Sequence, residues 1–210
     1  RALQAGYKVL EIHGAHGYLL HSFLSPLSNQ RKDDYGVSLK NRMRLVTEVA
    51  TQVRAAWPRD LPLFFRISSV DGASDGWSIQ DSVKLTSCLK IIGVDVVDCS
   101  SGGISGSATA GNTKKLRPGF QVPYAAQIRA ETGIKTMTVG LITHPLQAEE
   151  ILNDGCADLI AIGREALANP NWALHAAQAL YGSENFENWP KQSGWWLKRR
   201  AASSDLYRPT

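Results

Sequence analysis

The feature of this sequence that most constrains its fold is a regular alternation of short apolar segments with amphipathic ones. Strand-like segments occur at 7–13, 61–69, 94–103, 134–140 and 157–163, and each is followed by a helix-like segment. Strands that are buried on both faces have continuous apolar sequences, as these segments do. Strict strand-then-helix repetition predicts an α/β fold with a parallel sheet and right-handed crossovers.

Several of the predicted helices have recognisable ends. One begins near Ser38 and ends at Pro58, after a long loop rich in Ser, Asn and Asp that follows the first strand. The next has Ser78 as its N-cap, with Asp81 in the position of a capping box, and stops at Gly93. Three more helices are expected to open at Pro123, to cover 145–155, and to run from about 171 to 180.

Two architectures fit this alternation of strands and helices, an open doubly wound sheet and a (β/α)8 barrel. The open sheet usually carries GxGxxG after its first strand, and that motif is absent. The barrel places functional residues at the carboxyl ends of its strands. The unusual residues of this chain stand there: His13, Arg66, Ser100, Gly140, Gly163 and Arg164. We therefore predict the C-terminal portion of a (β/α)8 TIM barrel, with about five βα units and the first three missing.

The composition excludes several classes of protein. No apolar run approaches the roughly 20 residues of a membrane span, so no membrane partner is expected. The net charge is +4 without a basic stripe through the chain, which argues against nucleic acid as a partner. Cys88, Cys99 and Cys156 form no CxxC pair, which is typical of reduced thiols in a cytoplasmic protein. The N-terminus has no initiator Met and no signal peptide, so we expect a chain without its beginning.

The last two predicted strands end in candidate phosphate ligands. Gly140 ends one strand, and Gly163 with Arg164 ends the next. Barrels frequently bind phosphate after their seventh and eighth strands, where glycine lets backbone N–H groups approach and Arg adds a forked donor. The alternative is that these glycines only form tight turns. Arg66 leaves two interpretations open, a contact with an anionic cofactor atom or a salt bridge in the barrel mouth.

The segment "EIHGAH" at 11–16 carries two histidines after the first strand. A zinc site is disfavoured, because the zincin motif needs histidines four apart on a helix with an intervening Glu. General acid–base catalysis, a structural role, and donation by both imidazoles to one oxygen remain open. In the last case His13 and His16 form an oxyanion-type clamp, and Tyr18 stands near enough to supply a proton.

Together these motifs resemble the old yellow enzyme family of flavin-dependent ene-reductases, most closely its bacterial, thermophilic-type branch. The resemblance rests on "EIHGAHGYLLHSFLSPLSNQRKDDYG", "SLKNR", "FFRIS", "VDCSSGG", "VGLIT" and "ADLIAIGREALANPNW", and runs in order from residue 1 to about 180. It implies FMN in a barrel mouth, reduced by NADPH or NADH. The flavin would then pass hydride to the activated C=C bond of an enone or similar small-molecule alkene.

The resemblance also implies roles for individual residues. His13 and His16 would bind the substrate carbonyl oxygen, and Tyr18 would be the proton donor. Contacts with FMN would come from Arg66 at the ring edge, Ser100 on the flavin side, and Gly140, Gly163 and Arg164 at the phosphate. Trp196 and Arg199 match tail residues that reach a neighbouring subunit's substrate site, and the family implies a homo-oligomer. The alternative for these two is a solvated basic tail.

The expected organisation is a partial FMN-binding barrel at 1–185, corresponding to strands 4 to 8 of the family, and a tail at 186–210. One departure is Val37, where the family usually has glycine. If that position needs a positive φ, Val strains the turn. Two other functions stay open: a non-catalytic fragment or half-barrel that needs a complementary N-terminal half, and another phosphate-binding barrel enzyme.

Overall fold

The computed structural model describes residues 1–104, 116–182 and 186–203. The part of the expected tail at 204–210 lies outside these residues. The chain forms two compact units. The first comprises Arg1–Ile142 with Ile151–Ala161, and the second comprises Thr143–Glu150 with Ile162–Thr210.

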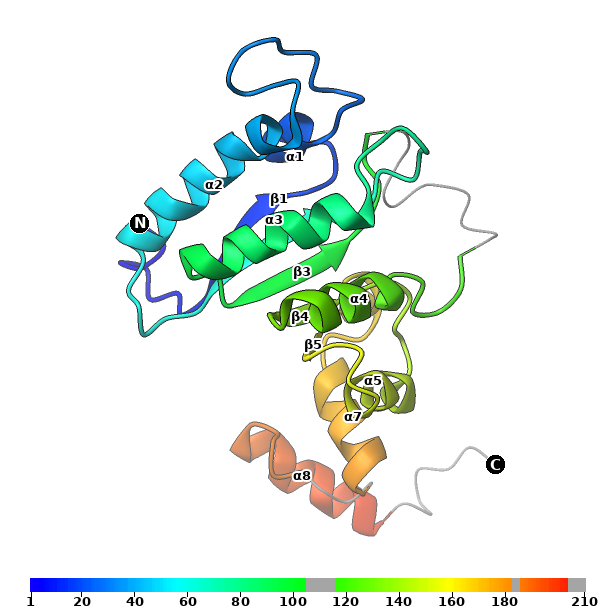
Figure 1. Cartoon of the computed structure of the whole chain (residues 1–210). Coiled ribbons are helices and arrows are strands. Elements are labelled where there is room, and N and C mark those ends of the chain that lie inside the picture. Colours follow the sequence, from blue (N-terminus) through cyan, green and yellow to red (C-terminus); the bar gives the residue numbers. More distant parts are fainter. Residues whose placement is uncertain (105–115, 183–185, 204–210) are drawn as a thin grey trace. The chain divides into compact units, whose positions relative to one another are not determined.

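The first unit is built on a parallel sheet in which the five strands lie in chain order (Figure 1). The strands are β1 (Leu10–Gly14), β2 (Leu63–Ser68), β3 (Val96–Ser100), β4 (Lys135–Thr138) and β5 (Leu159–Ile160). This confirms the predicted α/β fold of parallel strands that alternate with helices. The last strand is shorter than expected, because only two residues of 157–163 pair with β4.

Helices α1 (Leu19–Leu24), α2 (Leu39–Ala56), α3 (Ile79–Ile92), α4 (Val122–Thr132) and α5 (Pro145–Asn153) follow the first four strands. The predicted ends are confirmed at α2 and α3. The hydroxyl of Ser38 accepts from the backbone N–H of Asn41, and Ser78 forms a capping box with Asp81. Gly93 ends α3 in the left-handed conformation, with φ 103°.

Helix α1 corrects the expectation of an uninterrupted loop between the first strand and Ser38. It has only six residues, and its N-cap, Tyr18, makes no side-chain capping hydrogen bond. The sequence therefore contains no N-cap residue of the usual kind that would mark the start of this helix. Burial of Leu20, His21 and Leu24 holds the helix in place instead.

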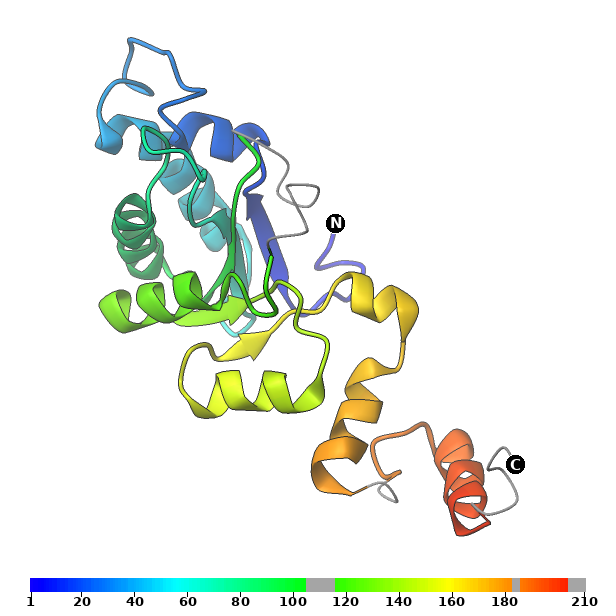
Figure 2. The same cartoon turned by 90° about the vertical axis from the view of Figure 1, so that its right-hand side faces the viewer.

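The two faces of the sheet differ in burial. One face packs under the helices and carries fully buried side chains such as Phe65, Ile67 and Val97. The opposite face is half-buried or exposed at His13, Arg66 and other positions of its strands. Figure 2 shows α2, α3 and α4 on one side of the strands. In a closed barrel this second face is the interior.

The second unit is helical. It contains α6 (Arg164–Ala168), α7 (Trp172–Tyr181) and α8 (Lys191–Ala202). Helix α8 lies in the segment that was expected to be a tail, so a large part of that segment has regular structure. The division of the chain at 185 stays a prediction. Among the described helices of both units, none combines the length and apolar character needed to cross a membrane.

Candidate functional site

Three aromatic side chains of the predicted site gather at the carboxyl end of β1. The His13 ring lies 5.3 Å from the His16 ring and 5.4 Å from the Tyr18 ring, measured between ring centroids. The strand ends at Gly14, and His16 and Gly17 then turn the chain with φ values of 60° and 79°. The structure therefore brings together three of the five residues that the resemblance assigned to substrate.

Close backbone packing fixes this turn. A Cβ atom on Gly17 would lie 2.3 Å from the carbonyl oxygen of Gly103, and one on Gly103 would lie 2.3 Å from the backbone of His16. Only glycine fits at these two positions. The backbone N–H of His16 also donates to the hydroxyl of Ser68 (3.0 Å), which donates to the carbonyl of Gly102 (2.7 Å). The turn after β1 is thus held by the ends of β2 and β3.

The ring of His16 has a buried partner. Its Nε2 shares a 2.6 Å hydrogen bond with the hydroxyl of Ser100, at the end of β3. Desolvation, with Arg66 and His13 adding to it, lowers the pKa of His16 to about 4. Desolvation and Arg66 also lower the pKa of His13. Both imidazoles are therefore neutral at pH 7, and each has one N–H to donate.

Arg66 lies beside His13 in the sheet and is paired with Asp98 on its other side. Its Nε is 2.9 Å from Oδ2 of Asp98, whose side chain is 3% exposed. Desolvation raises the pKa of Asp98 to about 7, although Arg66 opposes that rise. Of the two interpretations of Arg66, the salt bridge is present. The Arg66 side chain remains 28% exposed, and the flavin contact stays a prediction.

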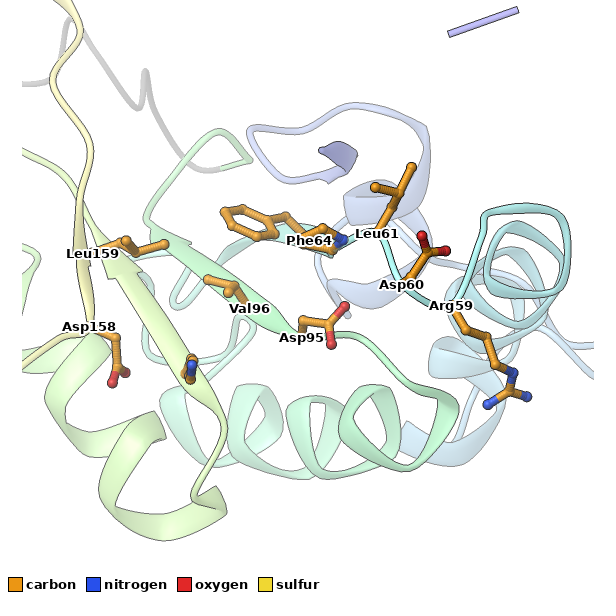
Figure 3. A pocket seen from close by; sticks show the side chains of 10 residues that line it. Arg59, Asp60, Leu61, Phe64, Asp95, Val96, Asp158 and Leu159 are labelled. Carbon is orange, nitrogen blue, oxygen red and sulfur yellow. The ribbon is translucent and has the colours of Figure 1, made fainter. Parts of the chain in front are cut away.

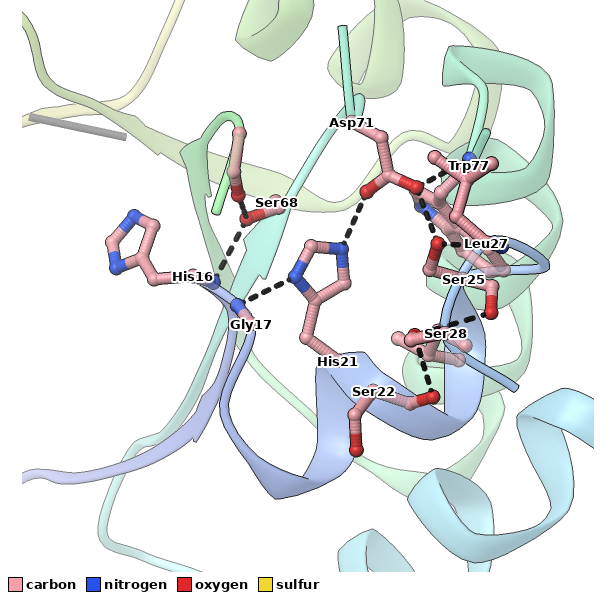
Figure 4. Close-up of polar contacts among 12 residues, drawn as sticks. His16, Gly17, His21, Ser22, Ser25, Leu27, Ser28, Ser68, Asp71 and Trp77 are labelled. Carbon is pink, nitrogen blue, oxygen red and sulfur yellow. Dashed lines mark hydrogen bonds and ion pairs between the residues drawn. The ribbon is translucent and has the colours of Figure 1, made fainter. Parts of the chain in front are cut away.

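Sequence reasoning missed a second histidine network behind the turn. The Nδ1 atom of His21, on α1, accepts from the backbone N–H of Gly17 (2.9 Å), and Nε2 lies 2.9 Å from Oδ1 of Asp71 (Figure 4). The other carboxylate oxygen accepts from the hydroxyl of Ser25 (2.5 Å) and the backbone N–H of Trp77 (2.7 Å). The spacing of four residues between Gly17 and His21 was the one sequence signal for this contact, and nothing in the sequence pointed to Asp71.

The predicted phosphate ligands fall in both units. Gly140 follows β4 in the first unit with φ 124°, and a Cβ there would lie 2.8 Å from the Phe120 ring. Gly163 and Arg164 belong to the second unit, where Gly163 is the N-cap of α6. The tight-turn interpretation is supported for Gly140. Phosphate binding by the three residues together stays a prediction.

Trp196 and Arg199 both lie on α8. The Arg199 guanidinium carbon stands 3.7 Å from the ring centroid of Trp195 and 5.9 Å from that of Trp196. Trp195 and Trp196 are about half exposed or more. The arginine is thus held against two aromatic faces, which is a usual cation–π arrangement. The inter-subunit role of Trp196 and Arg199 stays a prediction.

A pocket of about 510 Å³ opens at the opposite end of the sheet, among residues that begin the strands (Figure 3). Two of the three carboxylates that line it, Asp95 and Asp158, have structural partners. Asp95 accepts from the backbone N–H of Leu63 (2.8 Å), and Asp158 accepts from that of Thr136 (2.9 Å). Residues at this end of a barrel commonly serve stability. No predicted site residue lines this pocket. Within the described ranges, no three His, Cys, Asp or Glu residues gather as metal ligands.

Comparison with known proteins assigns the chain to a family. The profile of the NADH:flavin oxidoreductase / NADH oxidase family matches residues 1–183. The chain belongs to this family. An NADPH dehydrogenase from Geobacillus sp. (strain WCH70) is 48% identical over 180 residues, which cover 86% of this chain and 51% of that protein. The chain thus spans about half the length of this NADH:flavin oxidoreductase relative.

Two solved structures agree with the fold. The old yellow enzyme homologue from Zymomonas mobilis is 25% identical with a TM-score of 0.67, and the match covers 85% of this chain and 48% of that one. A 2-naphthoyl-CoA reductase in complex with 2-naphthoyl-CoA is 27% identical with a TM-score of 0.76, covering 87% of this chain and 27% of that one. The five parallel strands therefore match part of an old yellow enzyme-type TIM barrel, as predicted from the sequence.

Proposed function

We propose that this chain supplies the substrate clamp and part of the FMN site of an ene-reductase that uses NADPH or NADH. The observation that carries the proposal is the cluster of His13, His16 and Tyr18 at the carboxyl end of β1. The family membership supports a flavin oxidoreductase. When bound, FMN supplies the hydride that is added to the activated C=C bond.

The clamp acts on the substrate oxygen. Hydride addition to an enone builds negative charge on its carbonyl oxygen, and preorganised N–H donors stabilise that charge more in the transition state than in the ground state. His13 and His16 are neutral at pH 7, so each offers one N–H without adding a cation. Since Ser100 occupies Nε2 of His16, Nδ1 is the ring nitrogen left to face the substrate, and it is a donor in the tautomer in which the Ser100 hydroxyl donates to Nε2. Tyr18, 65% exposed, gives its phenolic proton to the substrate α-carbon.

The donor set on the open face of the sheet fits an anionic ring edge. Arg66 is held by Asp98 through Nε, and its side chain remains partly exposed. It would hold the FMN ring edge there and favour negative charge on it. Ser100 would lie on the flavin side, and Gly140, Gly163 and Arg164 would bind the phosphate. This phosphate site rests on the family resemblance and on the usual position of such sites in barrels.

The test is one absorption spectrum of purified protein mixed with FMN, before and after NADPH under anaerobic conditions. We expect a yellow protein whose visible absorbance NADPH bleaches. Arg66→Gln should weaken FMN binding, whereas Arg129→Gln should not. Arg129 is a matched control, because its Nε is also 2.9 Å from an aspartate, Asp158. Protein that takes up no FMN would contradict the proposal for this chain.

A second candidate is a half-barrel that works only with a complementary N-terminal half. The open face of the sheet favours it, since His13 is exposed and Arg66 is only half-buried. Mixing with an N-terminal half from a relative should then restore flavin binding. The expected partners otherwise remain a small electrophilic alkene and, through Trp196 and Arg199, a second copy of the chain.

A further inference from the structure

We infer that the buried His21–Asp71 pair is a positioning device that sets the geometry of the His16–Gly17 turn, and through it the substrate clamp. The inference rests on the proposed function only for its effect on catalysis. The pair itself is formed without a cofactor. Both side chains are completely buried, and they join α1 to the loop that follows β2.

The hydrogen-bond directions fix the protonation of the pair. The backbone N–H of Gly17 points at Nδ1 of His21, so this nitrogen must accept and cannot carry a proton. The imidazole proton is therefore on Nε2, which lies 2.9 Å from Oδ1 of Asp71. A doubly protonated ring would place an N–H against the N–H of Gly17. His21 is thus held as one neutral tautomer.

Asp71 is fixed as the ionised partner. Burial by itself would raise its pKa, but hydrogen bonds from His21, Ser25 and Trp77 hold the pKa below its usual value. Gly76 leaves space for this arrangement, because a Cβ there would lie 2.8 Å from the Asp71 side chain. The carboxylate accepts hydrogen bonds from Ser25 and Trp77 and faces Nε2 of His21. The N–H groups of an Asn side chain at this position would point at one of these donors.

The turn needs such support. His16 is a non-glycine residue in the left-handed region, which strains its backbone, and Gly17 continues that conformation. The N–H of Gly17 has His21 as its acceptor, and a buried N–H that loses its acceptor is destabilising. Because His16 and Tyr18 flank this N–H in sequence, loosening it moves the substrate donors themselves. Figure 4 shows the relay from Asp71 through His21 to Gly17, next to His16.

The decisive variant is Asp71→Asn. It keeps the size of the side chain but offers His21 an amide, which favours the opposite tautomer, as substitution of the triad aspartate does in serine proteases. Nδ1 would then be protonated, and the Gly17 N–H would lose its acceptor. His21→Gln retains one acceptor and one donor and is the conservative variant. His21→Leu has neither. Ser82→Ala removes the acceptor of the Trp77 indole N–H (2.6 Å), and it is the control for a buried polar deletion next to the network that leaves the side chains of His21 and Asp71 unchanged.

Two measurements read the result. The first is nitrogen NMR of His21 with amide hydrogen exchange of Gly17, in protein with and without FMN. We expect an unprotonated Nδ1 in the unchanged protein. Exchange at Gly17 should be at least tenfold faster in Asp71→Asn and His21→Leu, but not in Ser82→Ala.

The second measurement is the kinetics of the flavin-loaded protein. Enone kcat/KM should fall by about 10²-fold in Asp71→Asn and recover to within about tenfold of normal in His21→Gln, while reduction by NADPH changes little.

The two proposals fail separately. If the protein binds no FMN or reduces no enone, the proposed function fails, whereas the NMR measurement still decides the role of the pair. The positioning role is overturned if Nδ1 of His21 is protonated in the unchanged protein. It is also overturned if Gly17 exchange in Asp71→Asn matches that in Ser82→Ala.

Discussion

The imidazole of His16 and the hydroxyl of Ser100 share a 2.6 Å hydrogen bond, although 84 residues separate them in the chain. One group leaves the end of β1 and the other is the last residue of β3. The contact selects which His16 nitrogen stays available, since Nε2 is taken and Nδ1 is not part of this bond. The end of one strand thus orients a histidine ring that is carried by another.

Ser100→Ala should therefore impair the clamp. Without its hydroxyl partner the His16 ring gains rotational freedom, and we expect enone kcat/KM to fall by about 10- to 100-fold. Ser101→Ala is the matched control, because the neighbouring hydroxyl of Ser101 donates to the side chain of Gln121 (2.6 Å) rather than to His16. Equal kinetics for the two variants would show that the hydrogen bond to Ser100 does not orient His16.

His16 should titrate far below an ordinary histidine. Its pKa in the folded protein is about 4 because of desolvation and the charge of Arg66. The unfolded chain therefore takes up this proton first as the pH falls. The neutral ring contributes stability that is complete above about pH 6.5 and is lost between pH 6.5 and 4. Proton NMR of the His16 ring measures the pKa directly. A midpoint near 6.5 would mean that the ring is solvated and outside the contacts described.

Asp98 should act on stability with the opposite sign. Its folded pKa of about 7 exceeds that of an unfolded aspartate, so its protonated form favours folding. The contribution is complete below about pH 4 and is lost as the pH rises through 7. Asp98→Asn should remove this decline, which urea unfolding between pH 4 and 8 measures. Asp158→Asn is the control, because the pKa of Asp158 is lowered and its loss should weaken the protein at neutral pH. Identical pH profiles for the Asp98 and Asp158 variants would contradict the assignment.

Val37→Gly should stabilise the protein. Val37 has φ 66° and is 72% exposed, so it strains the backbone and buries little in return. Relief of the left-handed penalty should raise the free energy of unfolding by about 1 kcal/mol, after the greater freedom of glycine in the unfolded chain is subtracted. Val9→Gly, at an exposed position without a positive φ, should be neutral or destabilising. A destabilised Val37→Gly variant would show that the side chain supports the turn.

The order of the strands and several helix ends were predictable because they depend on local patterns. Ser38, Ser78 and Gly93 carry capping signals that the structure uses. The positive φ of Val37 fulfils the condition under which the sequence predicted strain. Helix α1 was missed because its six residues have no capping side chain and its stability comes from burial.

The buried polar pairs behind the candidate site could not be predicted, because the two residues of each pair are distant in sequence. His21 and Asp71 come together only when α1 and the loop after β2 are packed against each other. The same holds for Arg66 and Asp98, which pair across neighbouring strands. His13, His16 and Tyr18 could be predicted because they leave one strand end within six residues. The predicted roles of Gly140, Gly163, Arg164, Trp196 and Arg199 await experiment.

The most direct test of the clamp is reoxidation of the flavin-loaded protein by an enone. The protein is first reduced with NADPH under anaerobic conditions, an enone is added, and the return of visible absorbance is followed. We expect a fast return in the unchanged protein. In His13→Ala/His16→Ala the return should be at least 10²-fold slower, with reduction by NADPH impaired much less. Return of absorbance at the unchanged rate in the double variant would contradict the clamp.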